Sequence, residues 1–111
     1  LKVWDVKEGA GEPAKADATV RVHYTGWTTD GQVFDSSRPR NATLTRKLAD
    51  LIAGWKEGVP GMKPGGVRRL LIPPILAYGD KPRPKIPAGS TLVFEIEFLG
   101  DPLKRPDLDS K

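Results

Sequence analysis

Glycine and proline most constrain this chain, because they divide its 111 residues into short segments. The sequence contains twelve glycines and eleven prolines, spread over its whole length. Proline lacks a backbone N–H and ends helices and central strands, and glycine marks turns and tight connections. A chain divided in this way favours short strands joined by turns over long helices.

The clearest strand is TLVFEIEFLG, residues 91–100. Its apolar side chains alternate with Glu95 and Glu97, so one face of the strand would be buried and the other would meet water. The buried face would carry Leu92, Phe94, Ile96 and Phe98.

The segment TVRVHYTGW, residues 19–27, alternates in the same way. We expect Tyr24 to point inward with the neighbouring valines, and His23 to point outward. The dipeptide Asp30-Gly31 follows and is typical of a hairpin tip, so residues 33–37 would return as a strand. Two further strands are expected, at residues 2–6 and 67–73.

One short helix is expected within LADLIAGWKEGVPGM, residues 48–62, where apolar residues recur at helical spacing. Gly54 and Gly58 weaken a helix, and Pro60 followed by glycine ends it. We therefore expect only about two turns, near residues 53–59.

These elements predict an α+β fold, in which an antiparallel sheet of five or six strands wraps its apolar face around one short helix. The length fits one domain. We expect this domain to cover residues 1–100 and to be followed by a polar tail, residues 101–111, that lacks periodicity and would be mobile.

Composition excludes several kinds of chemistry. The chain has no cysteine, which excludes disulfides, thiol nucleophiles and thiolate metal sites, and its one histidine, His23, argues against a zinc site. The net charge of +4 is mild, and no aromatic stacking platform accompanies the basic run KPRPK, residues 81–85, so we do not expect nucleic-acid binding. No apolar run reaches the roughly 20 residues that span a bilayer. We expect a soluble monomer without cofactor or metal, in the cytoplasm or the periplasm.

The residues argue against two classes of enzyme, hydrolases and nucleotide-binding enzymes with a phosphate-binding loop. A hydrolase built on His23, Asp35 and Ser36 or Ser37 is disfavoured, because His23 would point away from the core and no strand–GxSxG–helix elbow is present. GMKPGG, residues 61–66, lacks the spacing of a phosphate-binding loop. Trp4 and Trp27 are assigned to packing. On periodicity alone, the side chains of Trp55, Tyr24 and Phe94 would also be assigned to the core.

The order of six short motifs changes that assignment. VHYTG, DGQVFDSS, RPRN, IAGWKEGVPGMKPGG, ILAYG and IPAGSTLVFEIEFL follow one another along the chain. In this order and at this spacing the sequence resembles the FKBP-type peptidyl-prolyl cis-trans isomerases over nearly its whole length. The resemblance implies an apolar pocket between helix and sheet that takes a proline ring, with X-Pro peptides, folding proteins and the family's macrolide inhibitors as partners.

The resemblance also implies roles for particular residues. Trp55 would form the pocket floor, and its walls and rim would be formed by Tyr24, Phe34, Phe94, Leu44, Leu51 and Ile86. The Ile52 backbone N–H and the Tyr78 hydroxyl would donate hydrogen bonds to substrate carbonyls. Asp35 would lie at the pocket edge, held by the Tyr24 hydroxyl and by Arg40, with a purely structural ion pair as the alternative.

Two segments depart from the family pattern. The segment of residues 42–50 is shorter than in the human-type domain and lacks its aromatic residues, and residues 80–88 carry proline and charge where relatives have glycine and aliphatic residues. These departures bear on substrate preference and macrolide affinity. Residues 80–88 also support a rival interpretation, a non-catalytic proline-binding or chaperone-like module that docks through the same pocket and this basic loop.

Overall fold

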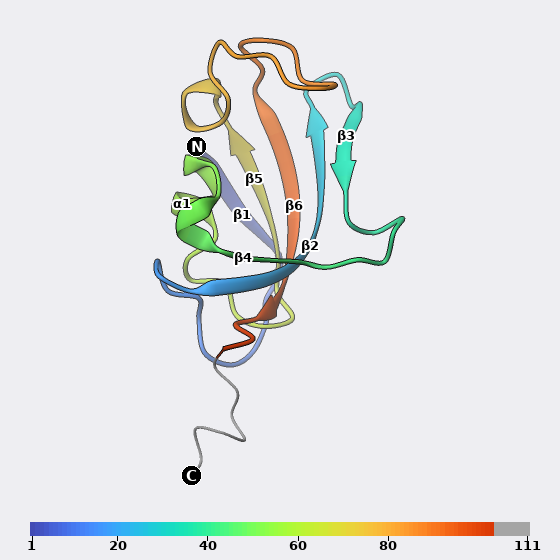
Figure 1. Cartoon of the computed structure of the whole chain (residues 1–111). Helices are drawn as coiled ribbons and strands as arrows, with labels where there is room; N and C mark the ends of the chain where they lie inside the picture. Colours follow the sequence, from blue (N-terminus) through green and yellow to red (C-terminus); the bar gives the residue numbers. More distant parts are fainter. Residues whose placement is uncertain (104–111) are drawn as a thin grey trace.

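The structure is a computed structural model that describes residues 1–103 (Figure 1). Residues 104–111, most of the expected tail, lie outside the described part. In chain order the strands, the α-helix and two 3-10 helices (η) are β1 (Lys2–Lys7), β2 (Thr19–Thr28), β3 (Val33–Ser36), β4 (Leu44–Lys47), η1 (Leu48–Asp50), α1 (Ala53–Gly58), β5 (Val67–Ile72), η2 (Pro74–Leu76) and β6 (Leu92–Gly100).

All strand pairs in the six-stranded sheet are antiparallel. Five strands lie in the order β1-β5-β6-β2-β3, and β4 pairs with the first half of β2. The long strand β2 pairs with β6 over residues 21–28, with β3 over residues 25–27, and with β4 over residues 19–22, where the sheet curls across the helix (Figure 1). The expected α+β fold is confirmed.

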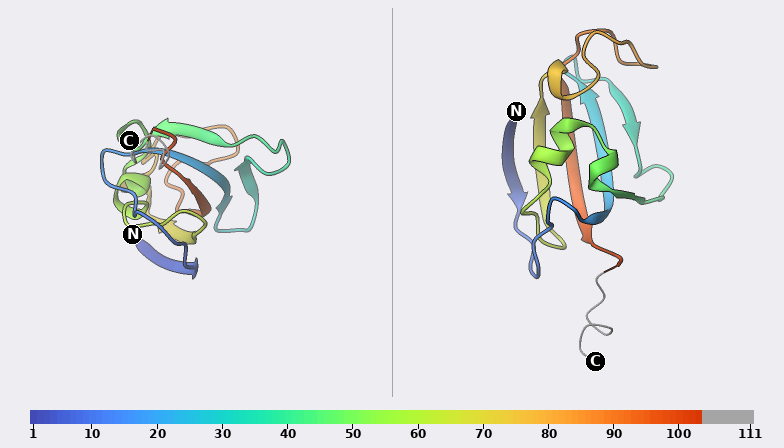
Figure 2. Two further views of the ribbon diagram at one scale, coloured as in Figure 1. Left: turned by 90° about the horizontal axis from the view of Figure 1, so that it is seen from below. Right: turned by 60° about the vertical axis from the view of Figure 1, so that its left-hand side comes forward.

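The helix α1 lies across one face of the sheet, against β5 (Figure 2, right). Its two glycines explain this close approach. A Cβ atom at Gly54 would lie 2.5 Å from Cγ2 of Ile72, and one at Gly58 would lie 2.7 Å from Cδ2 of Leu70. The residues that weaken the helix locally are therefore the residues that let it pack on the sheet.

The core lies between this helix and the curled face of the sheet. It follows the alternation of the sequence, because every second residue of β6 from Leu92 to Phe98 is buried, and so are Val20, Val22 and Tyr24 of β2. Among residues 1–103, no helix is long and apolar enough to cross a membrane.

Two local features differ from expectation. Strand β4 was not predicted, because only Leu44 of its four residues is half-buried and the others are exposed, which leaves no alternation to detect. Trp4, assigned to packing from the sequence, lies on the edge strand β1 with 45% of its surface exposed.

Candidate functional site

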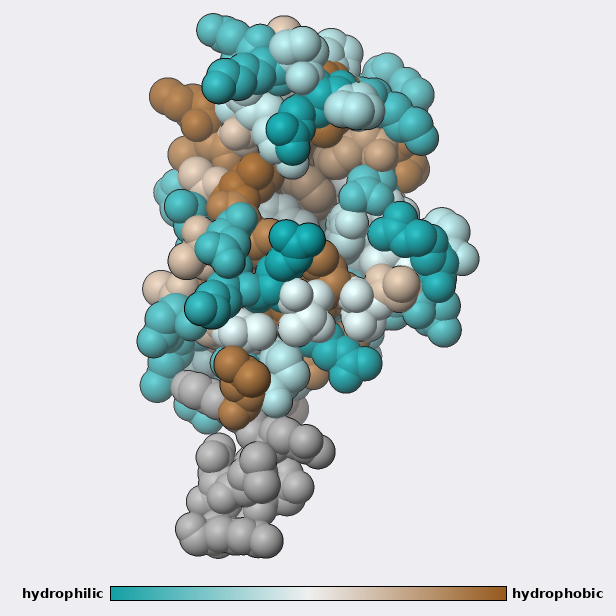
Figure 3. All heavy atoms as spheres, viewed as in Figure 1, coloured by the Kyte–Doolittle hydropathy of each residue, from teal (hydrophilic) through white to brown (hydrophobic). Residues whose placement is uncertain are grey.

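A hollow of about 130 Å³ opens beside the start of α1, against β2, β3 and β6. In the space-filling view, hydrophobic side chains surround an indentation below the hydrophilic top of the molecule (Figure 3). The hollow is lined by Tyr24, Phe34, Asp35, Leu44, Leu51, Ile52, Trp55, Tyr78 and Phe94. Most of these side chains are apolar, so the hollow suits a small apolar ring with polar groups at its edge.

Four aromatic rings form a continuous wall around this hollow. Trp55 and Phe94 meet edge to face with centroids 5.3 Å apart, and both are about 95% buried. Phe34 meets Phe94 at 5.5 Å, and Tyr24 meets Trp55 at 5.8 Å, again edge to face. Edge-to-face contacts are the preferred arrangement of aromatic pairs, so each ring fixes the orientation of the next.

Gly26 on β2 makes room for two of these rings. A Cβ atom at this position would lie 2.5 Å from Cζ of Phe34 and 2.9 Å from Cε1 of Phe94. Real contacts of this length do not occur, so a side chain here would displace the wall of the hollow. The sequence Tyr-Thr-Gly on β2 therefore supplies one ring and the space for two others.

The charged group of the hollow is Asp35. Its Oδ2 accepts a hydrogen bond of 2.6 Å from the Tyr24 hydroxyl, and its Oδ1 lies 3.6 Å from Nη1 of Arg40. Burial, followed by the hydrogen bond to Asp35, raises the pKa of Tyr24, and Arg40 opposes this shift. The Tyr24 hydroxyl thus stays protonated at neutral pH and holds the carboxylate in place, whereas the half-exposed Arg40 pair is a weak contact.

Two hydrogen-bond donors of the hollow have no partner among residues 1–103. Ile52 precedes α1, and its carbonyl accepts hydrogen bonds from Trp55 N–H and Lys56 N–H, but its own N–H donates to no described group. The Tyr78 hydroxyl likewise makes no hydrogen bond within the described part of the chain. Both residues are only half-buried, so water can solvate these donors in the free protein and a bound molecule can replace that water.

The family profile described as FKBP-type peptidyl-prolyl cis-trans isomerase matches residues 10–99. The chain belongs to this family. It is 45% identical over 106 residues to the FKBP-type peptidyl-prolyl cis-trans isomerase FkpA of Escherichia coli strain K12, covering 96% of this chain and 39% of FkpA. It is 43% identical over 102 residues to the FK506-binding protein of Neisseria meningitidis, covering 89% of this chain and 94% of that relative.

The solved structures agree with the sequence comparison. The crystal structure of FkpA from Escherichia coli superimposes with a TM-score of 0.83 at 45% identity, covering 88% of this chain and 46% of that one. The chain thus spans less than half the length of FkpA.

Nine of the eleven site residues expected from the sequence line this one hollow of the FKBP domain. Arg40 lies outside the lining and reaches it only through Asp35. Ile86, expected at the rim, is 95% buried, packs into the core and lines a second hollow. Two hydrogen bonds of 2.8 Å join the backbone of Ile86 to that of Arg83 and close this turn.

His23 and Ser37 lie together, which strand phase alone did not predict. His23 Nδ1 lies 3.0 Å from Oγ of Ser37, and this oxygen also accepts a hydrogen bond of 2.8 Å from Tyr24 N–H. Ser37 is fully buried, so its hydroxyl cannot reach a substrate. The pair ties the end of β3 to β2, and Ser37 acts across strands rather than only within its own turn.

Arg83 lies in the basic loop that the sequence sets beside the pocket, but its contact there could not be predicted from the sequence. Its guanidinium carbon lies 4.6 Å from the centroid of the Tyr78 ring, in a cation–π arrangement. The only signal in the sequence is the basic run of residues 81–85, and nothing in that run indicates which ring it would contact.

Proposed function

We propose that this FKBP domain binds the proline of an X-Pro segment in the aromatic hollow and accelerates the cis-trans rotation of the bond before it. The observation that carries the proposal is the combination of an apolar, aromatic-walled hollow with two unused donors, Ile52 N–H and the Tyr78 hydroxyl. Membership of the family and 45% identity to a relative named as a peptidyl-prolyl cis-trans isomerase support it.

The barrier to be lowered is amide resonance. Rotation about a peptide bond crosses about 18–20 kcal/mol, and an X-Pro bond isomerises unaided in tens to hundreds of seconds. The planar amide is the more dipolar form and is better solvated by water than the twisted form. The walls of Trp55, Phe34 and Phe94 exclude water and offer no replacement for that solvation. Each ~1.4 kcal/mol of preference for the twisted amide gives a tenfold faster rate.

The two free donors hold the rest of the substrate while the bond turns. Ile52 N–H and the Tyr78 hydroxyl each bind a carbonyl oxygen of the segment beside the proline. Holding the flanking chain fixes one side of the bond, so that the other side turns against it in a defined orientation. The glycines of α1 let this helix pack closely on β5. Because Ile52 immediately precedes the helix, its N–H is positioned before the substrate arrives.

Asp35 has an electrostatic and positioning role. The reaction moves no proton, so a carboxylate is not needed as a base. Its negative charge lies at the edge of the hollow, where it favours the carbonyl carbon of the twisted amide, and its hydrogen bond orients Tyr24.

The ligands that we propose are X-Pro segments of peptides and of unfolded or folding proteins. The relative from Neisseria meningitidis is named as an FK506-binding protein, and this chain keeps the aromatic walls. We therefore propose that the family's macrolides compete with peptides for the same hollow.

The test is a protease-coupled or NMR exchange assay on a short X-Pro peptide, with Trp55→Ala as the pocket variant. We expect acceleration over the thermal rate in the wild type and a loss of more than about tenfold in the variant. The variant should also lose roughly 3–5 kcal/mol of unfolding free energy, as large-to-small core changes do, so its folding is checked by circular dichroism. Peptide binding without acceleration would instead support the non-catalytic docking module.

A further inference from the structure

The loop after Tyr78 forms a small closed hairpin beside the hollow. Arg83 and Ile86 exchange two backbone hydrogen bonds of 2.8 Å, and Gly89 N–H donates to the Gly79 carbonyl, which closes the base of the loop. Between Arg83 and Ile86 stand a proline and Lys85, whose φ is +65°. Proline followed by a left-handed residue is the pattern of a type II turn. Such a loop presents its side chains with little ordering on binding.

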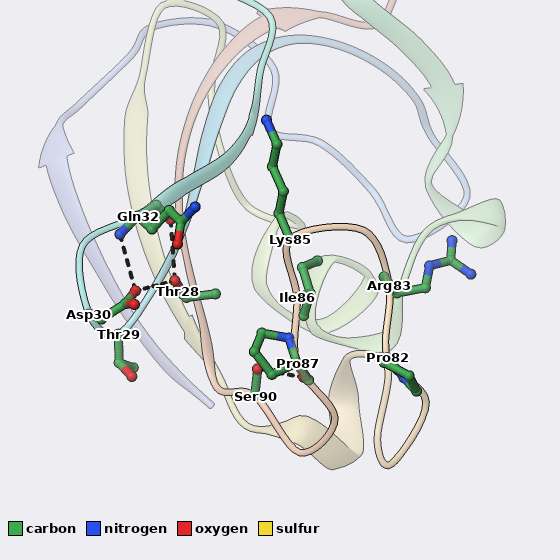
Figure 4. A pocket seen from close by; sticks show the side chains of 10 residues that line it. All are labelled: Thr28, Thr29, Asp30, Gln32, Pro82, Arg83, Lys85, Ile86, Pro87 and Ser90. Atoms are coloured by element: carbon green, nitrogen blue, oxygen red, sulfur yellow. Dashed lines mark hydrogen bonds between the residues drawn. The ribbon is translucent and has the colours of Figure 1, made fainter.

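This loop stands apart from the neighbouring hairpin as a ridge. A hollow of about 490 Å³ separates it from residues 28–32 at the tip of β2 and β3. In the close-up, Arg83 points away from that hairpin and Lys85 projects from the turn (Figure 4). Across the hollow Asp30 is held by its own turn, because its carboxylate accepts hydrogen bonds from the Thr28 hydroxyl and from Gln32 N–H.

The charge of the ridge is positive and is not neutralised. Residues 80–88 carry three cations, Lys81, Arg83 and Lys85, and one carboxylate, Asp80. Among residues 1–103, none of these four groups forms an ion pair. The guanidinium of Arg83 lies on the ring of Tyr78, which lines the proline-binding hollow, so this cation is the one fixed beside the site.

We propose that Arg83 is a specificity-determining residue, which favours substrates that carry Asp or Glu within two residues of the proline. The inference rests on the proposed function, because it assumes that the hollow takes the proline. A carboxylate beside the bound proline accepts hydrogen bonds from the N–H edge of the Arg83 guanidinium, one face of which lies on Tyr78, and Lys81 and Lys85 extend the same positive field. Charge complementarity of this kind acts mainly through the association rate and weakens as salt rises.

The test compares three peptides that differ only at one position two residues from the proline, which is Glu, Gln or Lys. Turnover is measured at low salt and near 1 M salt, where the Debye length falls to about 3 Å. We expect the Glu peptide to exceed the Gln peptide by about threefold or more at low salt, and this advantage to vanish at high salt. Peptides with the substitution before and after the proline are both measured, and the larger preference is taken.

Variants assign the effect to Arg83. In Arg83→Gln the ratio of Glu to Gln turnover should fall to near one, whereas Arg83→Lys should keep most of it because the charge remains. Lys85→Asn removes a more distant charge and suits the left-handed turn, so it should reduce the ratio less. The matched control is Lys63→Gln, an exposed cation near the opposite end of β5, which should leave the ratio unchanged.

Measurements of peptide binding distinguish a failure of this inference from a failure of the proposed function. The affinities of the same peptides, labelled with a fluorophore, are measured by anisotropy, which needs no turnover. A preference for Glu in binding that depends on Arg83, without acceleration, would overturn the isomerase proposal alone. Equal affinities for the Glu and Gln peptides at low salt, or a preference that survives in Arg83→Gln, would overturn the role of Arg83 even if all peptides are turned over.

Discussion

At the scale of single residues, the contacts of Asp35 bear on whether this carboxylate acts as a base or as a fixed charge. A base needs a substrate proton to accept, and the rotation of an X-Pro bond releases none. The observed partner of Asp35 is the Tyr24 hydroxyl, which donates a hydrogen bond of 2.6 Å to it. The resemblance of the sequence to its family suggested both contacts of Asp35. The sequence could not show that the Tyr24 contact is short and the Arg40 contact long, because both lengths depend on how β3 is bent against β2.

We predict that Asp35→Asn folds and keeps reduced but measurable activity. The amide preserves the shape of the carboxylate and can still accept a hydrogen bond from Tyr24, but it removes the charge. Turnover of a neutral X-Pro peptide across pH 4–8 checks this. Near-total loss, together with a wild-type rate that follows the titration of a carboxylate, would contradict the account of Asp35 as a charge rather than a base.

Tyr24 gives a second prediction, which concerns stability at high pH. Its pKa in the folded state is raised above the ordinary value near 10, first by burial and then by Asp35. A raised pKa means that the folded protein holds this proton more tightly than the unfolded chain. The resulting stability is fully present below about pH 10 and is lost as the pH rises through the folded-state pKa.

The measurement is the difference in unfolding free energy between the wild type and Tyr24→Phe, followed from pH 8 to pH 11 by urea denaturation. We expect the wild type to lose more stability than the variant above about pH 10. Other tyrosine and lysine groups titrate in both proteins and cancel in the difference. Parallel pH curves for the two proteins would show that the environment of Tyr24 is not as described.

At the scale of elements, a strand could be predicted from the sequence where one of its faces is apolar and buried. Strand β6 was predicted closely because one face is buried along its length and the other carries glutamates. Strand β4 was missed because it is held by backbone pairing with β2 rather than by an apolar face, and backbone pairing leaves no trace in residue type. The inward position of Ile86 was also missed, because Ile86 lies in a loop without an alternating apolar pattern.

The helix α1 yields a prediction at this scale. Replacing Gly54 by alanine should help an isolated helix by about 1 kcal/mol. In this fold the added Cβ would lie 2.5 Å from the side chain of Ile72, so we expect a net loss of about 1–3 kcal/mol in unfolding free energy. Lys56→Ala, on the exposed side of the same helix, is the control and should change stability by less than about 0.5 kcal/mol. A more stable Gly54→Ala protein would refute the packing role of this glycine.

At the scale of the whole molecule, the hollow joins distant parts of the chain. Its lining comes from β2, β3, β4, the connection between η1 and α1, α1 itself, the segment after η2, and β6. Sequence alone could not bring these parts together, and the family resemblance did so by analogy. Because the site spans the sheet and the helix, a ligand that binds there acts on the stability of the folded domain and not on one loop.

We therefore predict that an X-Pro peptide raises the melting temperature. At a free peptide concentration ten times its dissociation constant, binding adds about 1.4 kcal/mol to the folded state. For a domain of about 100 residues this corresponds to a shift of roughly 6–11 °C. Scanning fluorimetry with the peptide and with its Pro→Ala analogue checks this. An equal shift from the analogue would show that binding does not depend on the proline.

The most direct test of the central claim is one NMR titration that reads peptide and protein together. A short X-Pro peptide is mixed with a small amount of the ¹⁵N-labelled protein, and exchange between its cis and trans signals is recorded with the indole N–H of Trp55 and the amide of Ile52. We predict exchange peaks that the free peptide lacks, accompanied by shifts of these two protein signals. No cis-trans exchange beyond that of the free peptide, or exchange with shifts confined to residues away from the hollow, would contradict the account.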